Sequence, residues 1–182
     1  MKATAAGSTA LVIVLVVSAI YLGSTLLIAA LRLPWDMSLP PAIRVLGLLP
    51  IAAGSGMLAW LFRYRGFVDI LVSTHETFLK ILGRMPLQER RIRTEPLVVV
   101  GPYRLVRHPM YSGIGMIVLG IGVLTDHTWA LLGAVLLCVW FAYGIGPFEE
   151  RELKALFGLA YEDYARVTPR IVPIPWRRLR SR

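Results

Sequence analysis

The residues best suited to chemistry lie in the segment 101–115, GPYRLVRHPMYSGIG, at the start of an apolar stretch. Polar side chains are costly in segments that enter a bilayer, and they usually mark a functional site there. A second polar cluster, FEERELKALFGLAYEDY at 148–164, follows the next apolar stretch. Two polar clusters at the ends of one apolar hairpin predict a single ligand site.

The first cluster is organised by Pro109. The residue before a proline is disfavoured in helical geometry, so His108 is expected to be extended and to project from a turn together with Arg107. Pro109 can then begin a helix without leaving an unpaired N–H. Arg107 could clamp a carboxylate through two hydrogen bonds, or it could simply extend to the lipid headgroups.

The acidic pair Glu149 and Glu150 dominates the second cluster. Pro147 suits the first position of a helix, where carboxylates are stabilised by the helix dipole. A functional interpretation is that one of the two carboxylates faces the site. It would accept hydrogen bonds from ribose hydroxyls or from an ammonium group, or it would balance the positive charge of a sulfonium. Arg151 and Lys154 would pair with the other carboxylate and keep it solvated.

The apolar stretches that must position these clusters are long. The sequence is 56% hydrophobic, and a spanning helix needs about 20 apolar residues. We therefore predict an all-α integral membrane protein that forms one domain over residues 1–182. Its parts are spans at about 9–31, 43–62, 109–124 and 128–147, a loop at 63–108 and a helical cap at 148–182. The cap helix should break at Gly158. The first span is too long for the apolar core of a signal peptide and is expected to be retained.

The basic residues are unevenly distributed. Of 20 Lys and Arg, nine lie within 63–107 and eight from Arg151 onward, and the net charge is +9. With four spans, the N-terminus, the 63–108 loop and the C-terminus share one face, which the positive-inside rule makes cytoplasmic. The charge is therefore a topology signal with some attraction to anionic lipids, and no nucleic-acid-binding module is recognisable.

Metal chemistry has no support in the pattern. The single cysteine, Cys138, permits neither an intrachain disulfide nor a cysteine-based zinc site. His75-Glu76 would need a histidine at Leu79 to form a zinc-binding helix. The sequence predicts no metal site.

In combination, the two clusters resemble the isoprenylcysteine carboxyl methyltransferase family and its relatives, the phospholipid N-methyltransferases. The resemblance covers about 88–175, with GPYRLVRHPMYSG and EERELKALFGLAYEDYARVTPR as its motifs. It implies methyl transfer from S-adenosylmethionine to a lipid-like acceptor, in a cytoplasmic pocket closed by the C-terminal helices. It also implies a tunnel between the membrane helices for the acceptor; protein partners are not predicted.

Residue roles follow from the resemblance by position. The implied cofactor contacts are Gln88, Glu95, Leu97, Val98, Tyr103, His108, Pro109, Met110, Tyr111, Gly113, Gly115 and Glu149. The candidate catalytic residues are Arg107, His108 and Glu150. A carboxylate acceptor needs no general base, whereas an amine or phenol would need His108 or Glu150. Gly113 and Gly115 could also serve helix packing instead of ligand approach.

The departures from the family pattern concern the acceptor. Ile145 stands where the prenylcysteine enzymes carry a substrate-contacting arginine, residues 125–128 read TDHT where those enzymes have Asn-Pro, and Glu95 replaces a histidine. Acceptor recognition is therefore expected to differ. One alternative is an NADPH-dependent reductase of sterol type with related architecture, in which Arg107 would bind a 2′-phosphate. The Glu149–Glu150 pair favours a cationic cofactor over that alternative. A non-catalytic membrane protein is the third.

Overall fold

The computed structural model describes residues 2–67, 70, 74, 77, 79–80, 83 and 97–173. In this part of the chain all regular elements are helical, as predicted. They are α1 (Lys2–Leu31), α2 (Pro41–Leu46), α3 (Leu48–Phe62), the 3-10 turn η1 (Gly101–Arg104), α5 (Pro109–Thr125), α6 (Thr128–Val139), the π-helix η2 (Trp140–Ile145), α7 (Gly146–Phe157) and α8 (Leu159–Val167).

The helices have the lengths expected of an all-α membrane protein. By length and composition, three helical stretches of the described chain could cross a membrane: Ala10–Leu31, Pro41–Phe62 and Thr128–Phe157. The third predicted span is the shorter apolar helix α5, Pro109–Thr125. The four predicted spans thus correspond to α1, to α2 with α3, to α5, and to α6 with η2.

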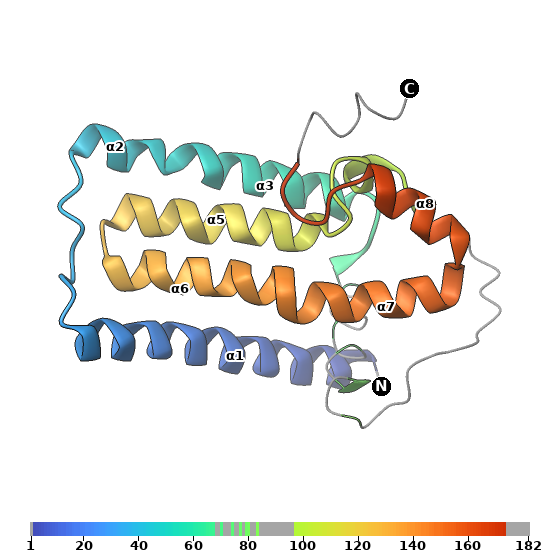
Figure 1. Ribbon diagram of the computed structural model, residues 1–182, viewed down its shortest axis with the longest axis horizontal. Coiled ribbons are helices and arrows are strands. Elements are labelled where there is room, and N and C mark those ends of the chain that lie inside the picture. The colour runs from blue at the N-terminus through green and yellow to red at the C-terminus, as the bar shows by residue number, and fades with distance from the viewer. Residues whose placement is uncertain are drawn as a thin grey trace.

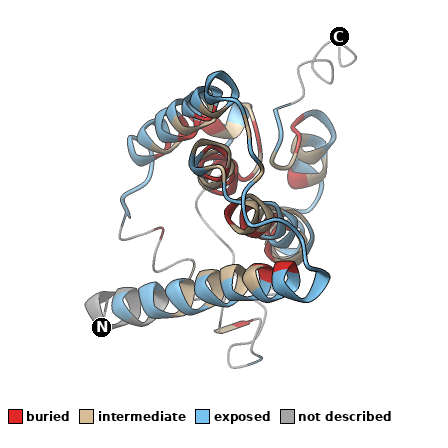
Figure 2. Ribbon diagram, turned by 90° about the vertical axis from the view of Figure 1, so that its left-hand side faces the viewer, coloured by how far each residue is buried: buried red, intermediate tan, exposed pale blue. Residues whose placement is uncertain are grey.

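The spans lie side by side in the order α3, α5, α6 and α1 (Figure 1). The connections α1–α2 and α5–α6 lie at one end of the bundle. The start of α1, the end of α3, the start of α5 and helices α7 and α8 lie at the other end. Buried residues concentrate on α5 and on the faces that pack against it, whereas α1 is largely exposed (Figure 2). The two polar clusters therefore meet at one end of the bundle.

Glycines allow α3 and α5 to approach closely. A Cβ atom added at Gly120 would lie 2.5 Å from the carbonyl oxygen of Gly47, and one added at Gly113 would lie 2.8 Å from the Leu58 side chain. Real Cβ atoms essentially never come this close, so larger residues would push the helices apart. This contact holds the start of α5, which carries the histidine motif, against α3.

The fourth span continues beyond the thickness of a bilayer. Its 30 residues, Thr128–Phe157, form a helical stretch of roughly 45 Å, whereas the hydrocarbon core is about 30 Å thick. Glu149 and Glu150 therefore lie beyond the 20 or so residues needed for crossing. Gly158, with φ +53°, ends α7 and starts the turn into α8, at the predicted position.

Candidate functional site

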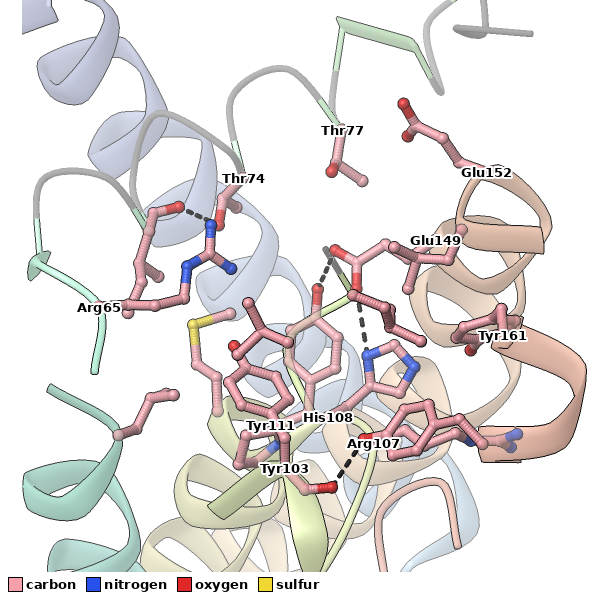
Figure 3. Close-up of a pocket in the computed structure, with 18 of the residues that line it drawn as sticks. Arg65, Thr74, Thr77, Tyr103, Arg107, His108, Tyr111, Glu149, Glu152 and Tyr161 are labelled. Atoms are coloured by element: carbon pink, nitrogen blue, oxygen red, sulfur yellow. Dashed lines mark hydrogen bonds and ion pairs between the residues drawn. The ribbon is translucent and has the colours of Figure 1, made fainter. Parts of the chain in front are cut away.

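A cavity of about 360 Å³, called the main cavity below because most predicted site residues line it, lies at the end of the bundle that holds both polar clusters (Figure 3). Residues of α3, η1, α5, α7 and α8 contribute to its wall. Nine predicted site residues line it: Leu97, Val98, Tyr103, Arg107, His108, Pro109, Met110, Tyr111 and Glu149. The two clusters, about 40 residues apart in sequence, therefore form one site.

His108 has the backbone conformation that Pro109 was predicted to impose. With φ −121° and ψ 70°, it precedes the first residue of α5, and its side chain is buried. Its Nδ1 lies 3.2 Å from Glu149 Oε2, and its Nε2 lies 3.3 Å from Glu150 Oε1. Burial alone would lower the pKa of His108, but the hydrogen bonds and charges of the two carboxylates outweigh it and raise that pKa. Both ring nitrogens are thus engaged by carboxylates, and neither is free to accept a proton from a substrate.

Glu149 faces the cavity, as the functional interpretation of the acidic pair required. Tyr111 Oη donates a 2.7 Å hydrogen bond to Glu149 Oε1, and His108 contacts the other oxygen of the same carboxylate (Figure 3). The Tyr111 ring stacks on Phe141 of the π-helix, with 4.7 Å between ring centroids. The carboxylate is thus oriented at the wall of the cavity by two side chains from the start of α5.

Glu150 has different partners, and here the predicted pairing was wrong. Arg170 binds its two oxygens from Nε and Nη2 at 2.8 and 2.7 Å, and Arg107 Nη2 lies 3.0 Å from Oε1. Lys154, one of the partners predicted for this acidic pair, instead pairs with Glu162 at 2.7 Å. Spacing along one helix indicates only neighbours on that helix, whereas Arg107 and Arg170 come from distant segments.

The charge state of Glu150 follows from these partners. Burial alone would raise its pKa, but the hydrogen bonds from His108 and Arg170 and the charges of Arg107 and Arg170 lower it to about 2. A carboxylate held in this way is a poor proton acceptor at neutral pH. The geometry therefore argues against the predicted role of Glu150 as a general base and gives the residue a structural task.

The segment after α8 lies against the histidine motif. The backbone N–H groups of Arg107 and His108 donate to the carbonyl oxygens of Pro169 and Arg170, at 2.9 and 3.0 Å. Ser112 Oγ donates to the carbonyl oxygen of Ile171. These bonds fix the turn that presents His108.

Besides Glu150, four predicted site residues either do not line the main cavity or lie outside the described chain. Gly113 packs against α3, and Gly115 faces Cys138 of α6, whose Sγ would lie 3.0 Å from an added Cβ. Both glycines therefore have a packing reason, and their contact with a ligand stays a prediction. Gln88 and Glu95 lie outside the described residues.

Comparison with known proteins identifies the family of this chain. The model of the phospholipid methyltransferase family matches residues 43–160, more than half of the chain. The chain belongs to the phospholipid methyltransferase family. No solved structure matches it significantly.

Named relatives of this family member are methyltransferases. Protein-S-isoprenylcysteine O-methyltransferase B of Arabidopsis thaliana is 40% identical over 85 residues, which cover 46% of this chain and 43% of that protein. Methanethiol S-methyltransferase 2 of Bradyrhizobium diazoefficiens is 30% identical over 146 residues, covering 72% of this chain and 53% of that protein. The chain spans about half the length of these curated relatives. Their names favour methyl transfer over the reductase alternative.

The cavity is also lined by residues that are not among the predicted site residues. Lys80 pairs with Glu152, and both residues line the cavity, as do Arg65, Thr74 and Thr77. Tyr161 and Tyr164 line the cavity from α8. The two tyrosines stand in the quoted second motif, and their spacing of three residues on a helix could have placed both on one face. In the described chain no group of three His, Cys, Asp or Glu side chains could hold a metal ion.

Proposed function

We propose that this protein is a membrane methyltransferase that transfers the methyl group of S-adenosylmethionine to a lipophilic or amphiphilic acceptor. The observation that carries the proposal is the carboxylate of Glu149, which Tyr111 and His108 orient at the wall of the cavity. Membership in a methyltransferase family supports the same chemistry.

The residues of the cavity match the chemical groups of this cofactor. Glu149 can hold an ammonium or a hydroxyl, or balance a sulfonium. Leu97, Val98 and Tyr103 offer apolar and aromatic surface for an adenine. When bound, S-adenosylmethionine supplies a methyl group on a positively charged sulfur. The residues we expect to hold it are these four, with Pro109, Met110 and Tyr111 completing the wall.

The protein's own contribution is positioning rather than proton transfer. Holding two reactants in line can supply up to about 7–11 kcal/mol of a barrier in favourable cases. Both nitrogens of His108 contact carboxylates, and Glu150 is held by two arginines, so neither residue is a good base. We infer that the acceptor attacks in a form that is already nucleophilic, such as a carboxylate or a thiolate. The printed names of the relatives, O- and S-methyltransferases, are consistent with such acceptors.

The acceptor class follows from the place of the site. The cavity lies at the end of an apolar bundle, and Leu61, Leu153, Leu156 and Phe157 line it. We infer an acceptor with an apolar part that enters from the bilayer, and membrane lipids around the bundle. Ile145, where an arginine would contact a prenylcysteine substrate, argues for another acceptor. The many basic residues of the 63–107 segment favour a cytoplasmic location for this end of the bundle.

The proposal is tested by isothermal titration of the detergent-solubilised full-length protein with S-adenosylhomocysteine, with NADPH in parallel. We expect micromolar binding of the former and none of the latter. Glu149→Gln should weaken binding at least tenfold, because it removes the charge that faces the cavity. Asp163→Asn, which alters an exposed pair with Arg166 and does not line the main cavity, is the matched control and should bind normally. Binding of NADPH alone would overturn the proposal.

A further inference from the structure

Two buried hydrogen-bond donors at the site have no acceptor. In the described chain, Arg107 Nε and Tyr161 Oη are inaccessible to solvent and make no hydrogen bond. Tyr161 is 3% exposed, and the Arg107 side chain is 11% exposed. Buried polar groups are nearly always satisfied in folded proteins, so an unpaired donor needs a specific explanation.

Both donors belong to the wall between two cavities. Arg107 and Tyr161 line the main cavity, and both also line a second cavity of about 540 Å³ that is bordered by α7, α8 and Arg170. In Figure 3, Tyr161 lies on the same side of the main cavity as Arg107, next to His108. A ligand group in this wall could therefore accept from both.

Neighbouring tyrosines show that the unpaired hydroxyl is not a general feature of this site. Tyr164, three residues later on α8, donates to the carbonyl oxygen of Tyr103 at 2.7 Å. Tyr111 donates to Glu149 at 2.7 Å. Burial raises the pKa of Tyr161 to about 12, so its hydroxyl is protonated at neutral pH and can donate a hydrogen bond.

The surrounding charge selects the ligand. Arg107 and Arg170 both pair with the single carboxylate of Glu150, which leaves positive charge in excess on this side. Two donors beside excess positive charge match an oxygen anion.

We propose that Tyr161 Oη and Arg107 Nε form an oxyanion-binding site in the wall between the two cavities. This inference rests on the proposed function, since it assigns a ligand group to the same site. The oxyanion is either the carboxylate of the methyl donor's amino-acid part or the phosphate of a phospholipid. In both cases Tyr161 binds the ligand and takes no part in proton transfer.

The test compares Tyr161→Phe with the unmodified full-length protein in detergent. Titrations use S-adenosylhomocysteine, 5′-methylthioadenosine, which keeps the nucleoside but lacks the amino-acid part, and a soluble short-chain phospholipid. If the carboxylate is the ligand group, the variant should bind S-adenosylhomocysteine about tenfold more weakly and 5′-methylthioadenosine normally. If the phospholipid phosphate is the ligand group, the variant should bind only the phospholipid more weakly.

A stability measurement separates this role from a structural one. Without ligand, Tyr161→Phe should melt at the same temperature as the unmodified protein or higher, because it removes an unsatisfied hydroxyl. The control Tyr164→Phe loses a hydrogen bond and should melt lower. Unchanged affinity for all three ligands, or equal weakening of all three with a lower melting temperature, would overturn the proposal. If the unmodified protein bound the phospholipid but no S-adenosylhomocysteine, the proposed function would be wrong. The oxyanion site would then still be tested by comparing phospholipid binding of Tyr161→Phe with that of the unmodified protein.

Discussion

Adjacent glutamates at 149 and 150 have different partners, although they stand in the same turn of α7. Successive residues of a helix point about 100° apart, so one carboxylate faces the cavity and the other faces Arg107 and Arg170. His108 lies between them and contacts both. Glu149 thus lies at the cavity wall, whereas Glu150 binds the two arginines that pack beside it.

At the residue scale, Glu150→Gln should destabilise the protein strongly. The side chain is 13% exposed, and its loss of charge leaves Arg107 and Arg170 without their shared partner. Breaking a buried ion pair from one side costs about 3 kcal/mol or more. The unfolding free energy in detergent would be compared with that of Arg166→Gln, which breaks an exposed pair with Asp163 and should change it by less than about 0.5 kcal/mol. Equal small effects would contradict the structural role of Glu150.

The raised pKa of His108 predicts how stability depends on pH. A group whose pKa is raised on folding contributes stability that is fully present below its unfolded pKa of about 6.5 and is lost as pH rises through the folded value. The melting temperature should therefore fall as pH rises from 6 through that value. Glu150, with a pKa of about 2, does not titrate in this range.

The matched variant for this pH profile is His108→Asn. It should melt at a lower temperature at pH 6 than the unmodified protein and show a flatter profile. A profile that keeps its slope in the variant would assign the pH dependence to another group.

At the element scale, the contact between α3 and α5 determines where the histidine motif lies. A Cβ atom at Gly54 would collide with the backbone carbonyl of Gly113, which cannot move as a flexible side chain would. A Cβ atom at Gly56, on the same helix, would meet nothing within 4 Å. Both positions are glycines of α3, but one is packed against α5 and the other faces open space.

We therefore expect Gly54→Ala to destabilise the protein by about 1–3 kcal/mol, and Gly56→Ala to leave its stability unchanged or slightly higher. Thermal unfolding in detergent measures both. Because α5 begins at the site, Gly54→Ala should also reduce methyl-donor affinity. Equal behaviour of the two alanine variants would mean that the helices can separate without cost.

At the scale of the whole molecule, the polar chemistry lies at one end of an apolar bundle (Figure 1). The opposite end is tied by a 2.7 Å contact between His127 Nδ1 and Asp36 Oδ1 and by a hydrogen bond from the Leu39 N–H to Asp126. The charge distribution predicts that the site end is cytoplasmic.

Thiol labelling tests this orientation. In a Cys138→Ala background, cysteine would be introduced at Ser38, at the far end, or at Leu159, at the site end; both positions are exposed. A membrane-impermeant thiol reagent applied to intact cells should label Ser38→Cys only. Labelling of Leu159→Cys alone would invert the predicted topology.

Local chemistry made much of this architecture predictable. Long uncharged runs of about 20 residues indicate membrane-spanning helices. Pro109 restricts the backbone conformation of His108, the residue before it. Gly158 adopts a positive φ that residues with a side chain avoid. Each of these effects depends on a few neighbouring residues. The resemblance of the two motifs then connected them to methyl transfer, and nine of the predicted site residues line one cavity.

The amino-acid sequence by itself thus determined the membrane helices, the end of the bundle that carries the chemistry and the family. Only the tertiary structure decided which glutamate faces the cavity, that Arg170 binds the other, and that Tyr161 has an unpaired hydroxyl. These features depend on contacts between segments 20 to 60 residues apart, such as Arg107 with Ala165. Local patterns carry no information on such contacts, because side-chain direction and partners are set only when the helices pack.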